Sequence, residues 1–203
     1  MPTRTPGHRP QLLGLLRSSQ FSTMATTKLY LLKYGLTPGP LFPDHWILFI
    51  FKSGDTSIIT STLLKPYPTQ TCIGDVYHVH GDSATGFAFE VKRNYNLGQA
   101  ETGPKRIYYI GDVLASSLTG TDIEVKDDCM DPEPKNLFEH TLIKAPIPGP
   151  SLQSVAVVSS DRPKTRVKLK NCQSWLIEAI DEAVQAGILT LTANAAFILG
   201  RPE

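Results

Sequence analysis

Asn171-Cys172-Gln173-Ser174-Trp175-Leu176 opens the segment that decides the fold of this chain. Its apolar residues recur every three or four positions on one helical face, at Cys172, Trp175, Leu176, Ala179, Ile180, Ala183 and Val184. The pattern predicts an amphipathic helix over 172–186, ended by Gly187, because glycine is favoured just past a helix C-terminus. Cys172 is therefore expected at the start of the helix and on its buried face.

This position of Cys172 favours a reactive thiol. The helix dipole and the free N–H groups of the first turn favour a negative group. We therefore expect the pKa of the Cys172 thiol to be lowered, with more of the nucleophilic thiolate present.

Histidines that such a nucleophile needs as a base lie far upstream, in predicted strands. His45 opens an apolar run through Phe51, which indicates a buried strand. His78 and His80 lie two residues apart in a second strand, so alternation places both on one face. A cysteine at a helix start, packed against histidines from neighbouring strands, is typical of a thiol hydrolase.

The rest of the chain predicts an α+β fold: an antiparallel sheet with helices on one side. The other expected strands cover 28–34, 86–95 and 106–111, with a hairpin loop at 81–86. The strand 46–51 is expected to pair with a segment around 57–64 or directly with 73–80. A short helix is expected over 136–144, and a last helix or strand over 188–199. The prolines of 129–134 exclude a helix or a central strand.

Composition excludes several classes of protein. The chain has 203 residues and a net charge of +1, which gives no reason to expect a nucleic-acid partner. Its three cysteines are widely spaced and form no CxxC pair, so we expect no metal and no cofactor. A sparse, odd number of cysteines suits a reducing compartment, so the predicted location is cytoplasmic. No apolar stretch is long enough to span a bilayer, so no stable membrane insertion is expected.

The N-terminal residues 1–26 differ from the rest. No acidic residue precedes Asp44, and residues 12–17 could form an amphipathic turn or two. This matches a mitochondrial transit peptide, which would change the location to mitochondrial. The alternatives are an unfolded extension and translation that begins at Met24. In each case the single folded domain is expected to cover 27–203.

Three short blocks carry a resemblance to a known family. They are His45-Trp46 at the start of a strand, Tyr77-His78-Val79 in a later strand, and Asn171-Cys172-Gln173 at a late helix start. In this order they resemble the permuted NlpC-type papain-like thiol enzymes, which include the lecithin:retinol acyltransferase-like and phospholipid acyltransferase-like proteins. Over 28–190 the chain also looks like a group of uncharacterised fungal proteins with the same blocks. The resemblance implies a circularly permuted papain-like domain.

The resemblance also implies roles. Cys172 corresponds to the nucleophile and His45 to the base that takes its proton. His78 corresponds to the group that orients the imidazole of His45, and His80 is the alternative because it shares the face of His78.

Two neighbours of the nucleophile are supporting candidates. Asn171 precedes it in the block. The side chain of Gln173, or the backbone N–H of Cys172, is a candidate donor to an oxyanion.

The chain departs from this family in one spacing. His45 and His78 are 33 residues apart, so residues 53–72 are expected to form an extra loop or strand.

Other groups have simpler explanations. Cys72 is expected to be buried and inert, and Cys129 lies among acidic residues that raise a thiol pKa. The basic stripe 164–170 is expected to be a solvated strand face, or alternatively a guide for an anionic substrate or a membrane surface.

Three function classes follow from the sequence. The first is a cysteine-dependent hydrolase or acyltransferase that acts on an amide, ester or thioester of a small-molecule acyl or peptide substrate. The second is a catalytically inactive member of the same fold that binds a ligand or peptide. The third is an interaction module without a pocket.

Overall fold

A single antiparallel sheet forms the frame of the molecule. The computed structural model describes residues 24–35, 44–56, 59, 71–99, 104, 106–120, 129–150 and 170–200. The strands are β1 Thr26–Tyr34, β2 His45–Gly54, β3 Cys72–Asp82, β4 Gly86–Asn96, β5 Arg106–Leu114, β6 Cys129–Asp131 and β7 Leu189–Leu191. They form a seven-stranded sheet in the order β6-β4-β3-β2-β1-β5-β7.

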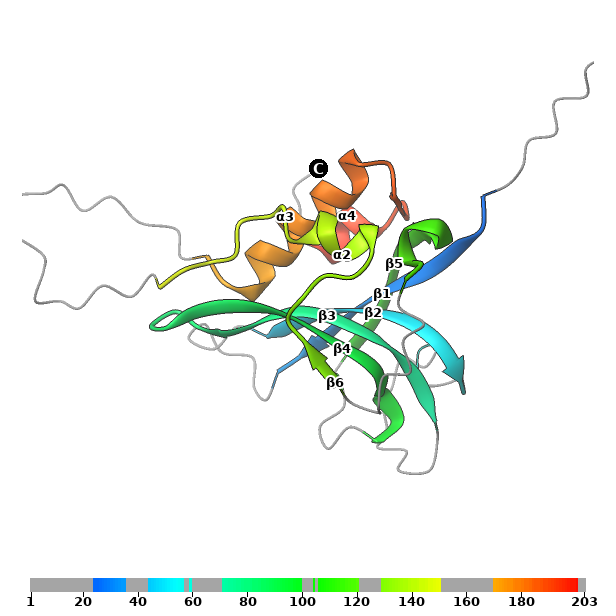
Figure 1. Ribbon diagram of the computed structural model, residues 1–203, viewed down its shortest axis with the longest axis horizontal. Coiled ribbons are helices and arrows are strands. Elements are labelled where there is room, and N and C mark those ends of the chain that lie inside the picture. Colours follow the sequence, from blue (N-terminus) through cyan, green and yellow to red (C-terminus); the bar gives the residue numbers. More distant parts are fainter. Residues whose placement is uncertain are drawn as a thin grey trace, which may run out of the picture.

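The helices gather on one face of this sheet (Figure 1). They are α2 Leu137–Leu142, α3 Cys172–Gln185 and α4 Ala195–Ile198, and two short 3₁₀ turns, η1 Leu97–Gln99 and η2 Ala115–Leu118, follow strands. The predicted α+β class, an antiparallel sheet with helices on one side, is therefore confirmed. The segment 188–199 forms both a strand and a helix, and the predicted helix over 172–186 is α3.

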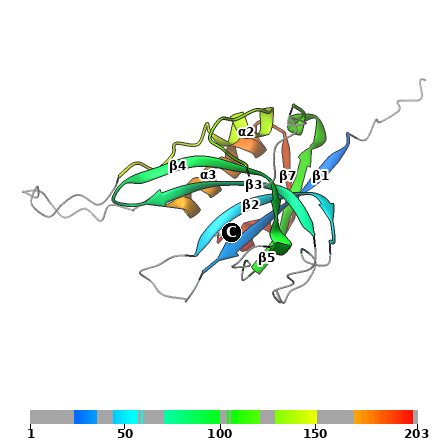
Figure 2. The same cartoon turned by 60° about the horizontal axis from the view of Figure 1, so that its bottom comes forward.

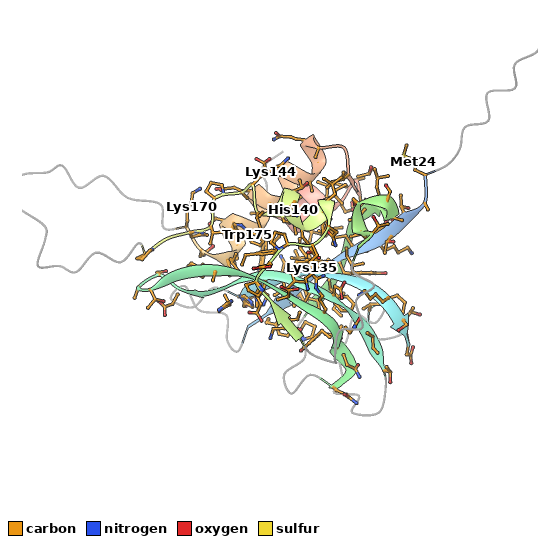
Figure 3. The ribbon with its side chains drawn as sticks, viewed as in Figure 1. Met24, Lys135, His140, Lys144, Lys170 and Trp175 are labelled. Carbon is orange, nitrogen blue, oxygen red and sulfur yellow. The ribbon has the colours of Figure 1, made fainter. Side chains whose placement is uncertain are left out.

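The main core lies between α3 and the sheet. Trp175 is fully buried and lies between them (Figure 3), with its ring centroid 5.8 Å from that of Phe89 on β4. The stripe predicted from the sequence is buried through Ala183, whereas Val184 is 39% exposed. A second cluster, around Leu32, covers the opposite face of the sheet.

The hairpin that joins β3 to β4 sets the register of both strands. Gly81 and Gly86 have φ of +129° and +93°, which side chains with a Cβ rarely adopt. Between them, Asp82 Oδ1 accepts hydrogen bonds from the backbone N–H groups of Ala84 and Thr85, at 2.7 and 2.8 Å. The expected hairpin loop at 81–86 is thus present, and its register pairs residue 78 with residue 90.

A buried ion pair ties α2 and β6 to β4. Arg93 of β4 donates two hydrogen bonds to Glu139 of α2, at 2.8 and 2.9 Å, and a third, from Nε at 3.3 Å, to Asp131 of β6. Because β6 is the edge strand, its position agrees with the exclusion of a central strand at 129–134.

The structure moves the start of the folded domain and identifies the partner of the strand 46–51. The strand β1 begins at Thr26, which pairs with Leu114, and the carbonyl oxygen of Ala25 accepts a hydrogen bond from Ala115. The folded part therefore starts at least two residues before the expected boundary at residue 27. The strand 46–51 pairs directly with β3. Most of the extra loop expected over 53–72 lies outside the described residues, and so does most of the segment considered at 57–64.

Candidate functional site

The candidate site lies where β2 and β3 separate. Their ladder runs from the end of β2 back to the pair formed by Leu48 and Tyr77, so residues 45–47 and 78–80 lie beyond it. Figure 2 shows the β3–β4 hairpin extending away from the start of β2. The N-terminus of α3 is attached here, because Gln173 Nε2 donates a hydrogen bond to the carbonyl oxygen of Asp44 at 2.7 Å.

Asn171 determines where α3 begins. Its side-chain oxygen accepts hydrogen bonds from the backbone N–H groups of Gln173 and Ser174, both at 3.0 Å. In return, Ser174 Oγ accepts a hydrogen bond from the Asn171 N–H at 2.8 Å. This reciprocal capping box satisfies donors that a helix start otherwise leaves free. The supporting residue Asn171 thus acts on Cys172 through the helix, as its cap.

The Cys172 thiol is enclosed, with the whole residue 7% exposed. The nearby backbone N–H groups of Trp46, Gln173 and Cys172 itself act to lower the pKa of the thiol. Burial opposes these donors and is the larger effect, so the pKa of the thiol is raised. The expected lowering of the Cys172 pKa is therefore wrong in direction, because desolvation outweighs the helix N-terminus.

His45 and His78 form a close imidazole pair. His45 Nε2 lies 3.1 Å from His78 Nδ1, and the two rings meet edge to face with centroids 5.2 Å apart. Burial lowers the pKa of both, that of His78 to about 3, and the nearby Lys92 and His80 add to the effect. Both rings are therefore neutral at pH 7.

His45 and His78 meet as expected, whereas a contact of either imidazole with the Cys172 sulfur stays a prediction. By strand alternation, His45 and His78 lie on the face opposite the helices, because their neighbours Trp46 and Tyr77 belong to the core beneath α3. Cys172 comes from the helix side, and its neighbour Gln173 is bound to the carbonyl oxygen of Asp44, the residue before His45.

Of the two histidines on β3, His78 and not His80 contacts His45. His78 touches His45, whereas the side chain of His80 is 56% exposed and turns its Nδ1 to Glu90 Oε2 at 2.9 Å. The same oxygen lies 3.4 Å from His78 Nε2. Glu90 is 6% exposed, so a buried carboxylate stands behind the imidazole pair.

Sequence reasoning missed Glu90. The signal that could have found it is the expected hairpin loop at 81–86, because folding the chain about that loop places residue 90 opposite His78. It also missed the carbonyl of Asp44 and the N–H of Trp46, because every residue has such main-chain groups and a sequence pattern cannot distinguish them.

Gln173 takes a different role from the one considered. Its side-chain amide is bound to the carbonyl of Asp44 and so attaches the helix start to β2. The backbone N–H groups of Trp46, Gln173 and Cys172 are the main-chain donors that act on the pKa of the thiol.

Other candidates lie away from the site. Cys72 is fully buried in the second cluster, and burial raises the pKa of its thiol to about 11. The side chain of Cys129 lies outside the described residues. So does the stripe 164–170 apart from Lys170, which forms an ion pair with Glu178 at 2.8 Å.

The described residues contain neither a metal-binding group nor a membrane-spanning helix. No group of three or more His, Cys, Asp or Glu side chains in these parts of the chain is arranged to hold a metal ion. None of the helices in the described ranges has the length and apolar character needed to traverse a bilayer.

Fold and site together define an α+β protein with two buried imidazoles in contact, in which a helix start that carries a buried cysteine is attached to the residue before one of them. Comparison with protein families matches residues 29–190 to a family of unknown function, DUF6540, and the chain belongs to this family. No curated protein and no solved structure matches the chain significantly.

Proposed function

We propose that the protein is a cysteine-dependent hydrolase or acyltransferase with a circularly permuted papain-like arrangement. One observation carries the proposal: Gln173, next to Cys172, donates its side-chain amide to the carbonyl oxygen of Asp44, directly before His45, and His45 in turn contacts His78. The order His, His, Cys along the chain and the helix start placed against a sheet support the same arrangement.

The protonation states favour a general-base mechanism. Because burial keeps both the Cys172 thiol and the His45 imidazole neutral, little thiolate exists before substrate binds. The thiol proton moves to His45 as the sulfur attacks an acyl carbon, and an S–C bond forms. The N–H groups of Cys172 and Trp46 are then suited to the oxyanion of the tetrahedral intermediate.

Collapse of that intermediate completes the step. The bond from the acyl carbon to the leaving group breaks, and His45 returns its proton to the leaving group, which leaves a thioester on Cys172. Water, or an acceptor hydroxyl or amine, then attacks the thioester. His45 takes the proton of this second nucleophile and passes it to the departing sulfur, so no external reductant or oxidant is needed.

The test is direct detection of the thioester. A panel of p-nitrophenyl esters, thioesters and peptide amides is incubated with the full chain, and the mass added to the protein is mapped to a residue. We expect an acyl group on Cys172. Cys172→Ala should abolish turnover, and His45→Ala should lower it about 100- to 10,000-fold, the usual contribution of a general base. His78→Asn should be milder, because an amide can still orient the ring.

Cys72→Ala is the matched control, since it removes a thiol that is also buried but lies in the second cluster, around Leu32. Its turnover should equal that of the parent protein. Acylation of Cys72 in place of Cys172 would contradict the proposal.

Burial of the thiol favours one alternative, a catalytically inactive member of the same fold that binds a ligand or peptide. Cys172 is only 7% exposed, so a substrate must displace its cover before it reaches the sulfur. If a panel compound binds with measurable affinity but never adds mass to Cys172, this alternative replaces the enzyme.

A further inference from the structure

Glu90 is a buried carboxylate behind the imidazole pair. Its Oε2 lies 3.4 Å from His78 Nε2 and 2.9 Å from His80 Nδ1. Its Oε1 and the Nε2 of His78 are both buried and have no hydrogen-bond partner among the described residues. The carboxylate is therefore the one acidic group that faces His78 Nε2 in the described part of the chain.

The 3.4 Å approach of Glu90 Oε2 is an electrostatic contact and not a formed hydrogen bond, and it favours the proton on one nitrogen of His78. A neutral imidazole has one N–H and one bare nitrogen, and a carboxylate only accepts hydrogen bonds. A bare Nε2 would turn its lone pair toward the lone pairs of Glu90, which is repulsive in a buried site. His78 therefore carries its proton on Nε2 and leaves Nδ1 bare.

The proton on His78 then dictates the proton on His45. The bare Nδ1 of His78 lies 3.1 Å from His45 Nε2, so a hydrogen bond between them requires His45 to donate from Nε2. This leaves Nδ1 of His45 bare. A bare nitrogen is what a base needs in order to take the proton of Cys172.

We propose that Glu90 is a positioning residue, which through His78 holds His45 in the tautomer that can accept a proton from Cys172. The catalytic consequence of this assignment rests on the proposed thiol chemistry, whereas the tautomers themselves do not. His80 contacts the same carboxylate from the solvent side, and Glu90 reaches both histidines because the β3–β4 register places it opposite His78.

The tautomers can be measured without any substrate. In the full chain labelled with ¹⁵N-histidine, long-range proton–nitrogen spectra distinguish protonated from bare ring nitrogens, and His45→Gln and His78→Gln assign the signals. We expect Nε2–H on both rings of the parent protein. Nδ1–H on His78 in the parent protein would overturn the proposal.

Two substitutions of Glu90 separate its hydrogen-bonding role from its bulk. Glu90→Gln keeps an oxygen acceptor of similar size, so both rings should remain Nε2–H. Glu90→Leu removes the acceptor, so His78 should shift to Nδ1–H, which forces His45 to the Nδ1–H tautomer as well. If Glu90→Leu melts as a folded protein and both rings stay Nε2–H, the proposal fails. If Glu90→Leu does not fold, a shift of either ring in Glu90→Gln overturns it.

His80→Gln serves as the matched control, because it removes the exposed partner and leaves the contact between Glu90 and His78. Its tautomers should match those of the parent protein. The alkylation rate of Cys172 by iodoacetamide at pH 7 should fall at least tenfold in Glu90→Leu, and remain within about twofold in His80→Gln. Absence of the Nε2–H tautomers in the parent protein refutes the role of Glu90, whereas their presence without any acyl-enzyme refutes only the proposed function.

Discussion

Breaking the buried ion pair between Arg93 and Glu139 should cost a large part of the stability of this protein. Both side chains are almost completely enclosed, with Arg93 1% and Glu139 0% exposed. Glu139 also accepts hydrogen bonds from the backbone N–H of Lys135 at 2.6 Å and from Asn136 Nδ2 at 2.9 Å. Its carboxylate therefore joins α2 and the preceding loop to β4.

The expected magnitude follows from the burial. Glu139→Leu leaves the Arg93 guanidinium buried with only Asp131 as an acidic partner, and removing one partner of a buried pair costs about 3–5 kcal/mol. For a domain of this size ~1 kcal/mol corresponds to about 2–4 °C, so the melting temperature should fall by roughly 10 °C. The double variant Arg93→Met/Glu139→Leu removes both charges at similar volume. It should therefore be more stable than Glu139→Leu, within about 2 kcal/mol of the parent protein.

Urea unfolding followed by circular dichroism measures all three free energies of unfolding. The reasoning is refuted if Glu139→Leu costs less than about 1 kcal/mol. It is also refuted if the double variant costs the sum of the two single variants, because an interacting pair must be non-additive.

Three further outcomes are expected. Burial lowers the pKa of His78 to about 3, below the ordinary value of the unfolded chain, so the unfolded state binds the proton first as pH falls. The free energy of unfolding should therefore drop by about 2 kcal/mol between pH 7 and pH 5 because of this residue. His78→Asn should remove this part of the pH dependence. The same pH dependence in His78→Asn and in the parent protein would show that Glu90 keeps the ring charged. Asn171→Ala removes the acceptor for two helix N–H groups and should cost about 1 kcal/mol in urea unfolding, with Asn171→Asp nearly neutral. A chain that starts at Met24 should melt higher than one that starts at Lys28, because the shorter chain loses the pairing of Thr26 with Leu114; equal melting temperatures would contradict this.

The local elements could be predicted because each has a local cause. The period of the apolar residues in 172–184 is enough to define α3 and its buried face, and Gly187 marks its end with φ of +70°. The strands β2 and β3 carry long apolar or alternating runs, and the β3–β4 loop contains the glycines that its turn requires. None of these inferences depends on residues distant in the chain.

The contacts of the site depend on long-range geometry. His78 and His80 lie two residues apart on the same face of β3 and have similar neighbours in the sequence. No local pattern could therefore show which of them contacts His45. The choice follows from the place where β2 leaves β3, which brings His45 to His78 and leaves His80 toward solvent. Glu90 becomes a partner only because the hairpin register pairs its strand with that of His78.

By itself, the sequence determined that this protein is an α+β domain with Cys172 at the start of its main helix and histidines on two strands, because periodicity and capping act over a few residues. Only the tertiary structure decided that His45 meets His78, that Glu90 stands behind them, and that the pKa of Cys172 is raised. The physical reason is desolvation: a helix start favours the thiolate locally, but Cys172 is buried in a core built from distant parts of the chain, among them Trp46, more than a hundred residues earlier.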